Sequence, residues 1–217
     1  MKAVLFDLDG VVVYTDAYHY RAWKRLADEE GWRFDETLND RLRGVSRLAS
    51  LEIILEHNGV ELTLERKEEF AARKNEYYKA LLETIDETAL VPGALDFIRA
   101  LRREKVLIGL GSSSRNATMV LDKLGITELF DAAVTGNDIT RSKPDPEIFL
   151  LGARKLGVEP AECVVFEDAP SGVESALAGG MTAVGFGPTE GLEAADILVA
   201  SYDRLDYAEF LRRLAVR

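Results

Sequence analysis

Residues 2–10 read Lys-Ala-Val-Leu-Phe-Asp-Leu-Asp-Gly, an apolar run of strand length that ends in two carboxylates and a glycine. Asp7 and Asp9 stand two positions apart, so their side chains point the same way on an extended backbone. Open α/β sheets bind ligands just beyond the carboxyl ends of their strands. Two like charges held this close favour a cation between them, or a proton on one of them. A magnesium ion, which prefers oxygen ligands, suits the pair, and a solvated strand end is the simpler alternative.

The composition of the chain limits its class. Its 217 residues, 47% of them hydrophobic, fit one domain with a sizeable core and a modest insertion. The formal net charge of −11 argues against a nucleic-acid partner, because phosphate backbones repel a negative surface. The single cysteine, Cys163, excludes an internal disulfide and favours a reducing compartment. With neither a recognisable signal peptide nor an apolar run of transmembrane length, a cytoplasmic protein without a membrane partner is expected.

From residue 14 to residue 90 the sequence has the pattern of amphipathic helices. Apolar residues recur at helical spacing in three stripes, formed by Ala22, Trp23, Leu26 and Ala27, by Leu48, Leu51, Ile54 and Leu55, and by Phe70, Tyr77, Leu81 and Leu82. Nothing in this segment has the pattern of a strand. We therefore expect a helical cap domain over residues 14–90, inserted into a core formed by residues 1–13 and 91–217.

After residue 91 the pattern alternates between strands and helices. The expected strands cover residues 106–110, 132–135, 163–166, 182–185 and 197–199, and the expected helices cover residues 94–103, 115–124, 148–156 and 171–178. Such alternation is typical of a parallel sheet with right-handed crossovers. The predicted fold class is α/β, a doubly wound, Rossmann-like parallel sheet with the helical cap inserted after the first strand.

Chemically active residues follow several of the expected strands. They are Asp7 and Asp9, Ser112, Lys143, and Glu167 with Asp168. Because the carboxyl ends of parallel strands meet at one edge of a sheet, these side chains are expected to share a cleft. A carboxylate nucleophile beside a hydroxyl, a lysine and further carboxylates suits phosphoryl transfer through an aspartyl phosphate. Mg²⁺ would neutralise charge on the phosphoryl oxygens, while the lysine and the hydroxyl would hold the remaining ones.

The order Asp-x-Asp-Gly, serine, Lys-Pro and Glu-Asp resembles the motifs of the haloacid dehalogenase superfamily, over essentially the whole chain. The resemblance implies that Asp7 is the nucleophile and that Asp9 is the general acid and base. It also implies that Asp7, the backbone carbonyl of Asp9, and Asp168 bind Mg²⁺, with Glu167 beside them. The serine and the lysine of the motifs would then grip the transferring phosphoryl group.

Several segments resemble the β-phosphoglucomutases of that superfamily. They are residues 16–23, 44–47, 73–75, 112–116 and 142–144. This resemblance implies interconversion of β-D-glucose 1-phosphate and D-glucose 6-phosphate through phosphorylated Asp7, with β-glucose 1,6-bisphosphate as intermediate and activator. The implied substrate-binding residues are Trp23, Gly44, Arg47, Ser50, Lys74, Arg115 and Asn116. His19 is expected to couple closure of the cap to the placement of Asp9.

Two residues depart from the mutase pattern. Tyr14 stands in the expected hinge, where a smaller polar or acidic residue is usual. Arg115 stands where lysine is usual, and a guanidinium holds phosphate as well or better. Without the resemblance, Arg47 and Lys74 would be read more simply as surface cations.

Two alternative functions remain open at this point. A Mg²⁺-dependent phosphatase acting on a small sugar phosphate would share the first half-reaction and complete the second with water. A binding or regulatory protein would retain the fold without the chemistry, which the intact Asp7, Asp9, Lys143 and Asp168 argue against. The expected partner is a small sugar phosphate, and a monomer is expected.

Overall fold

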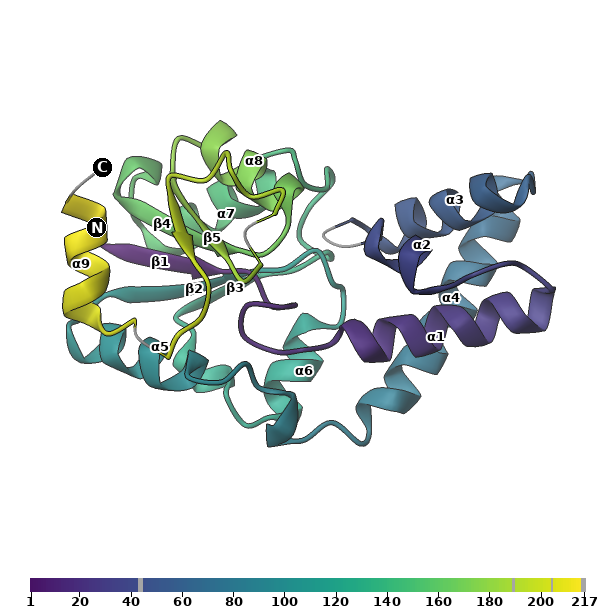
Figure 1. The fold of residues 1–217 in the computed structure, drawn as a ribbon, viewed down its shortest axis with the longest axis horizontal. Coiled ribbons are helices and arrows are strands. Elements are labelled where there is room, and N and C mark those ends of the chain that lie inside the picture. Colours follow the sequence, from purple (N-terminus) through teal and green to yellow (C-terminus); the bar gives the residue numbers. More distant parts are fainter. Residues whose placement is uncertain (43–44, 189, 204, 216–217) are drawn as a thin grey trace.

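The computed structural model describes residues 1–42, 45–188, 190–203 and 205–215, which form a sheet-containing core with a group of helices beside it (Figure 1). The described part of the core holds a six-stranded sheet in the order β3-β2-β1-β4-β5-β6, and each neighbouring pair is parallel. The strands are β1 (Ala3–Phe6), β2 (Leu107–Gly111), β3 (Ala132–Val134), β4 (Cys163–Glu167), β5 (Thr182–Phe186) and β6 (Ile197–Val199). The predicted parallel α/β sheet is confirmed, with strand bounds within one residue of those expected.

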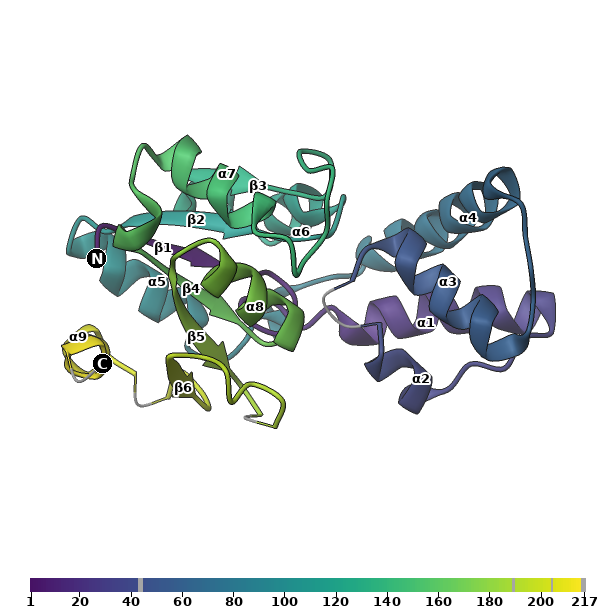
Figure 2. The same ribbon diagram turned by 90° about the horizontal axis from the view of Figure 1, so that it is seen from above.

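Helices cover both faces of the sheet (Figure 2). They are α5 (Ala94–Arg103), α6 (Ala117–Lys123), α7 (Glu147–Leu156), α8 (Pro170–Ala178) and α9 (Tyr207–Ala215). Successive residues of a strand point to opposite faces, and β1 therefore contributes to two apolar clusters. Ala3 and Leu5 pack in the cluster that α7 and α8 cover, whereas Val4 and Phe6 pack in the cluster that contains residues of α5, α6 and α9.

Helix α9 is not among the elements expected from the sequence. Its Phe210 is fully buried and lies against Phe97 of α5 and Phe166 of β4, with ring centroids 5.5 and 5.4 Å apart. Aromatic pairs at this separation add to the free energy gained from burying their area. The helix therefore closes the face of the sheet on which α5 lies.

Helix α6 begins at Ala117, two residues later than expected. The preceding loop is held in turns by its own serines, because Ser114 N–H donates to Ser112 Oγ and Asn116 N–H donates to Ser114 Oγ, each over 3.2 Å. Serine hydroxyls compete with helical hydrogen bonds in this way. The loop that contains Arg115 is thus a defined turn at the carboxyl end of β2.

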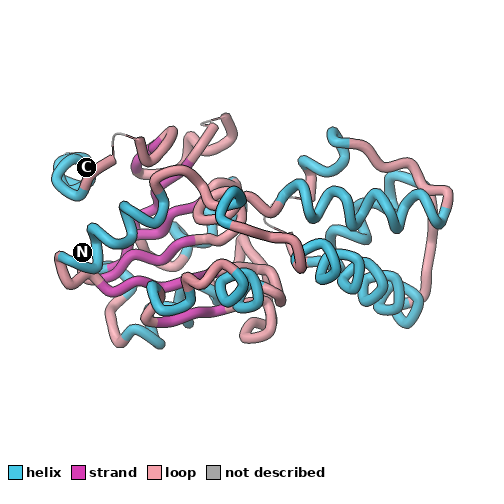
Figure 3. Tube along the Cα trace, turned by 90° about the horizontal axis from the view of Figure 1, so that it is seen from below, coloured by secondary structure: helices cyan, strands magenta, loops and turns pink. Residues whose placement is uncertain are grey.

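The second group of elements, here called the cap, consists of helices (Figure 3). It comprises α1 (Asp16–Glu30), α2 (Glu36–Asp40), α3 (Arg47–Asn58) and α4 (Leu64–Leu82). These helices bury an apolar cluster of their own, which includes Trp23, Leu51 and Phe70. No described helix is both long and apolar enough to cross a lipid bilayer.

Two chain segments connect the cap to the core, and they lie side by side. Val13 and Leu90 form an isolated antiparallel bridge, and Tyr14 N–H donates to the carbonyl of Ala89 over 2.7 Å. The side chain of Tyr14 is 52% exposed and lies outside the core. The paired segments hold the cap opposite the carboxyl edge of the sheet, where the expected site residues gather.

Candidate active site

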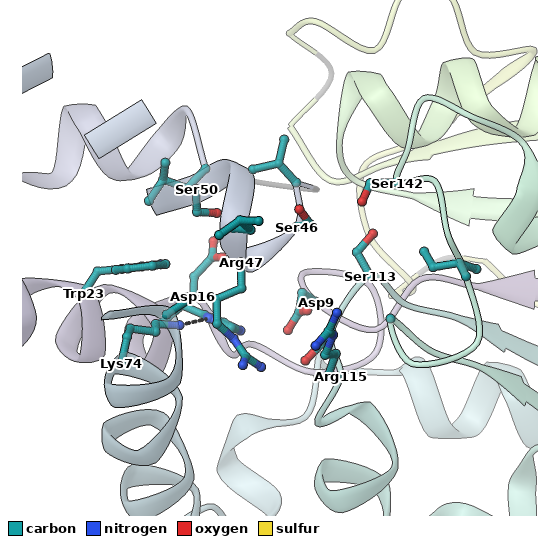
Figure 4. Close-up of a pocket in the computed structure, with 18 of the residues that line it drawn as sticks. Asp9, Asp16, Trp23, Ser46, Arg47, Ser50, Lys74, Ser113, Arg115 and Ser142 are labelled. Atoms are coloured by element: carbon teal, nitrogen blue, oxygen red, sulfur yellow. Dashed lines mark hydrogen bonds between the residues drawn. The ribbon is translucent and has the colours of Figure 1, made fainter. Parts of the chain in front are cut away.

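A cavity of about 540 Å³ lies between the cap and the carboxyl edge of the sheet (Figure 4). The predicted site residues that line it are Asp7, Asp9, His19, Trp23, Arg47, Ser50, Lys74, Arg115 and Asp168. Side chains from both parts of the molecule therefore face one space. Its volume is within the usual range for a small-molecule site.

Lys143 lies beneath the cavity floor, where its ammonium group joins two carboxylates. Lys143 Nζ donates to Asp7 Oδ1 over 2.6 Å, to the carbonyl of Gly111 over 3.1 Å, and to Glu167 Oε1. The side chains of Lys143 and Glu167 are each 1% exposed. Gly172 leaves room for this arrangement, because a Cβ there would lie 1.9 Å from the Glu167 carboxylate. The lysine thus fixes one oxygen of Asp7 and leaves the other for chemistry.

The pKa values of Lys143 and Glu167 are both raised, whereas an ion pair alone would raise that of the lysine and lower that of the glutamate. Burial lowers the pKa of Lys143, but Asp7 and Glu167 outweigh it and hold that pKa above its ordinary value. Burial also raises the pKa of Glu167 to about 7, because the attraction of Lys143 offsets only part of the desolvation. The ammonium therefore stays charged across the neutral range and serves as a fixed cation rather than as a proton donor.

Asp168 and Asp9 form an acidic patch in the cavity wall. A Cβ on Gly10, which has φ +77°, would lie 2.1 Å from Asp168 Oδ2, so only glycine lets this carboxylate come so near the backbone after Asp9. Burial, then Glu167 and Asp7, raises the pKa of Asp168 well above its ordinary value. Asp9 Oδ1 is buried and has no hydrogen-bond partner among the described residues. Crowded, undersatisfied carboxylate oxygens are the donor set that a hard dication requires.

No three His, Cys, Asp or Glu side chains in the described ranges are close enough to form a ready-made metal cluster. The ligand set implied by the sequence needs only two such side chains, Asp7 and Asp168, because the third protein ligand is the backbone carbonyl of Asp9. Mg²⁺ commonly completes its shell with water and phosphate oxygens rather than with further carboxylates. The residues present therefore fit a magnesium ion whose remaining ligands come from water and from a phosphate group.

Asp9 has the properties of a proton donor. Burial, reinforced by the charges of Asp7 and Asp16, holds the pKa of Asp9 well above its ordinary value. A raised pKa favours the protonated carboxyl group, which is the form that can give its proton to a leaving oxygen. This agrees with the acid–base role that the motif implies.

On the cap side, a buried lysine and a histidine are paired. Lys74 Nζ lies 2.8 Å from His19 Nδ1, and it lies over the rings of Trp23 and Tyr78 at 4.9 Å from each centroid. Burial, then the positive charges of Lys74 and Arg47, keeps the pKa of His19 well below its ordinary value. Neutral His19 can accept at Nδ1 from the amino group of Lys74. The buried location of Lys74, 1% exposed, contradicts its simpler reading as a surface cation.

Arg47 and Arg115 lie on opposite walls of the cavity, Arg47 on the first turn of α3 and Arg115 on the loop before α6 (Figure 4). Burial, then the charge of Arg115, lowers the pKa of Arg47. The two guanidinium groups therefore affect each other across the cleft. Burial, then the charge of Arg47, also lowers the pKa of Lys74 well below its ordinary value. The two arginines and Lys74 thus bring three basic side chains to a space that also contains the Asp7 carboxylate.

Four predicted site residues do not line the cavity: Ser112, Asn116, Lys143 and Glu167. Ser112 is fully buried, and Asn116 donates to a cap side chain instead of facing the cavity. A further predicted residue, Gly44, lies outside the described residues. The gripping role of Ser112 and the sugar contacts of Ser50 and Trp23 stay predictions.

Several lining residues were not expected from the sequence, among them Asp16, Asn39, Glu68, Ser113 and Ser142. Ser142 and Ser113 are chain neighbours of the predicted Lys143 and Ser112, and that adjacency could have indicated them. Asn39 and Glu68 belong to separate cap helices and have no sequence signal of this kind.

The sequence of the chain is similar to those of known sugar-phosphate enzymes. A family model described as haloacid dehalogenase-like hydrolase matches residues 1–180. The chain is 43% identical over 201 residues to a β-phosphoglucomutase from Bacillus subtilis (strain 168), covering 92% of this chain and 89% of that protein. It is also 36% identical over 182 residues to a phosphorylated carbohydrates phosphatase from Thermotoga maritima, covering 83% of this chain and 82% of that protein.

Among solved structures, the chain resembles a β-phosphoglucomutase from Clostridium difficile. The TM-score is 0.94 at 36% sequence identity, and the match covers 100% of both chains. A superposition of this quality includes the cap as well as the core.

Proposed function

Because the chain belongs to the haloacid dehalogenase-like hydrolase family, we propose that it is a Mg²⁺-dependent phosphotransferase that interconverts β-D-glucose 1-phosphate and D-glucose 6-phosphate. The observation that carries the proposal is the distribution of charge around the cavity. Arg47 and Arg115 supply cations away from the Lys143 and Asp7 pair, and Lys74 adds a basic side chain whose pKa burial lowers. This distribution supports places for two phosphates in the cavity. A phosphatase for a monophosphate needs only one.

The proposed reaction proceeds in two displacements. A carboxylate oxygen of Asp7 attacks the phosphorus of the bisphosphate, the bond from phosphorus to the sugar oxygen breaks, and Asp9 gives its proton to that oxygen. In the return step a hydroxyl of the sugar monophosphate attacks the phosphorus of the aspartyl phosphate, the bond from phosphorus to the Asp7 oxygen breaks, and Asp9 takes the hydroxyl proton. Bound Mg²⁺, held by Asp7, the Asp9 carbonyl and Asp168, would neutralise charge on the phosphoryl oxygens.

Residues 14–90 act as the cap in this proposal. Arg47 and Lys74 bind the phosphate that is not reacting, so a bound bisphosphate bridges the cap and the core. Bridging of this kind excludes water from the phosphorylated Asp7 and favours transfer to sugar over hydrolysis. The intermediate, β-glucose 1,6-bisphosphate, then turns end for end within the same cleft.

A sugar-phosphate phosphatase is the second candidate, and the 36% identity to a phosphorylated carbohydrates phosphatase favours it. Its first half-reaction would be identical, and water would replace the sugar hydroxyl in the second. An assay with β-glucose 1-phosphate and catalytic bisphosphate separates the two. Glucose 6-phosphate appearing faster than free phosphate supports the mutase, and the reverse order refutes it.

Arg47→Ala is expected to lower mutase turnover by roughly 10- to 100-fold, because a charged, bidentate phosphate contact is lost. Hydrolysis of a small phosphate monoester, which has no second phosphate, should change by less than about threefold by the same reasoning. Steady-state kinetics on both substrates measure the difference. Arg66→Ala is a matched control, because Arg66 is an exposed cap arginine that pairs with Glu69 and is not among the lining residues. Equal losses on the two substrates would refute the assigned role of Arg47.

Mg²⁺ is expected to stabilise the protein more as the pH rises, through Asp168. The pKa of Asp168 in the folded protein is raised above its ordinary value of 3.8, so the folded state favours the protonated carboxyl group. In metal-free protein the stability that this protonated group contributes is therefore fully present below pH 3.8 and is lost as the pH rises through the pKa of the folded state. Metal-free Asp168→Asn should therefore gain stability relative to the parent protein as the pH increases. Mg²⁺ binds the ionised carboxylate, so it should reverse that difference at high pH.

Thermal unfolding of both proteins, with Mg²⁺ and with a chelator, tests this expectation at a pH of about 5.5 and about 8. Comparing the parent with Asp168→Asn at each pH cancels the other titrating groups. A Mg²⁺-induced rise in Tm that is independent of pH, or one that survives in Asp168→Asn, would contradict the assignment of Asp168 as a ligand.

A further inference from the structure

One side-chain hydrogen bond joins the cap to the core beside the cavity. Asn116 Nδ2 donates to Asn75 Oδ1 over 2.8 Å, linking the end of the β2–α6 loop to helix α4. Both residues are partly buried. A second cap-to-core contact among the described residues, the ion pair of Lys123 with Glu83, lies at the end of α4, where the Glu83 side chain is 66% exposed. Exposed pairs of this kind contribute little to stability.

Each asparagine of the pair is adjacent in sequence to a residue that lines the cavity. Asn75 directly follows Lys74, and Asn116 directly follows Arg115. Lys74 and Arg115 both line the cavity, from the cap and from the core, whereas neither asparagine does. The hydrogen bond therefore joins the two backbone segments that carry these basic side chains. It adds a directional polar contact to the apolar packing of Ala22, Tyr78 and Leu82 of the cap in the core cluster.

Like charges on the two walls of the cavity act against this connection. Arg47 on the cap and Arg115 on the core both line the cavity, and these two like charges repel across the cleft, which lowers the pKa of Arg47. A hydrogen bond between two neutral amides opposes this repulsion without adding charge and without titrating. A phosphate dianion between the cations would remove the repulsion itself.

We propose that Asn75 is a positioning residue that latches the cap to the core through Asn116 and so sets the spacing of the cations on the two walls. The latch matters most before a phosphate is bound, because phosphate and latch both hold the two walls together. One consequence rests on the proposed mutase function. By keeping the cap aligned over Asp7, the latch reduces loss of phosphate to water.

The direct test is a distance measurement that needs no turnover. Spin labels at Glu61→Cys on the cap and Glu128→Cys on the core report the cap-to-core distance, since both positions are exposed and the native Cys163 is buried. The parent should give one narrow distribution, and Asn75→Ala should broaden it towards longer distances. Asn75→Asp, which keeps an oxygen to accept from Asn116, should restore the narrow distribution. Added inorganic phosphate should narrow the distribution of Asn75→Ala.

Glu83→Gln is the matched control, because it removes the second cap-to-core contact and should leave the distribution unchanged. The ratio of glucose 6-phosphate formed to phosphate released should fall about three- to tenfold in Asn75→Ala, the range for one hydrogen bond, and return in Asn75→Asp. An unchanged distribution in Asn75→Ala, or equal broadening in Asn75→Asp, would overturn the latch. A parent protein that forms no glucose 6-phosphate would refute the proposed function alone, and the distances would still decide the latch.

Discussion

Asp7→Asn is expected to lose turnover by at least about 10⁴-fold on any phosphate ester, because a carboxamide cannot form the acyl phosphate. The fold should tolerate the change. Lys143 keeps Glu167 and the carbonyl of Gly111 as partners, and the substitution removes one of the buried negative charges around it. Chemistry and stability are therefore separable at this position. The measurement is the mass gained by the protein after exposure to β-glucose 1,6-bisphosphate, together with initial rates.

The parent protein should gain the mass of one phosphoryl group, and Asp7→Asn should gain none while unfolding at nearly the same temperature. Asp96→Asn provides the control, since Asp96 lies on α5 with its side chain 88% exposed and should behave like the parent. Phosphorylation that persists in Asp7→Asn would refute the assignment of Asp7 as the nucleophile.

Most of the sheet could be predicted because its strands are short apolar runs that end at turn-forming residues or at chemically active side chains. Residues 163–168 illustrate this, with a buried strand that ends at Glu167 and is followed directly by Asp168. Helix α9 was missed, although Phe210 is part of the central aromatic cluster. A short amphipathic segment after the last strand depends on tertiary contacts for its stability, and sequence alone does not display those contacts.

The core side of the candidate site was predictable for a topological reason, since parallel strands deliver their carboxyl ends to one edge. On the cap side, the resemblance to the mutases supplied the predicted residues that line the cavity: His19, Trp23, Arg47, Ser50 and Lys74. The remaining cap residues could not be predicted, because they meet the core only through the orientation of a separate helical group. Asn39 and Glu68 line the cavity from two different helices, and the contact between Asn75 and Asn116 spans 41 residues of sequence. No periodicity or local motif encodes contacts of that kind.

Lys143→Met is expected to destabilise the protein by about 3–5 kcal/mol at neutral pH, the usual result of leaving buried charges without their partner. Asp7 and Glu167 would then face each other without a cation, with side chains only 9% and 1% exposed. For a chain of this length the loss corresponds to a fall in Tm of roughly 6–20 °C. The loss should shrink at lower pH, because protonation relieves two carboxylates that no longer have a counter-ion.

Thermal unfolding of Lys143→Met, Lys143→Met/Glu167→Gln and Lys155→Met distinguishes a buried charge effect from general damage. The double variant removes one of the stranded carboxylates and should recover part of the lost stability. Lys155 also pairs with an aspartate in the core, at 3.0 Å from Asp138, but its side chain is 42% exposed, so Lys155→Met should cost no more than about 1 kcal/mol. A similar loss in both single variants, or no recovery in the double variant, would contradict the assignment of the loss to buried carboxylates left without their cation.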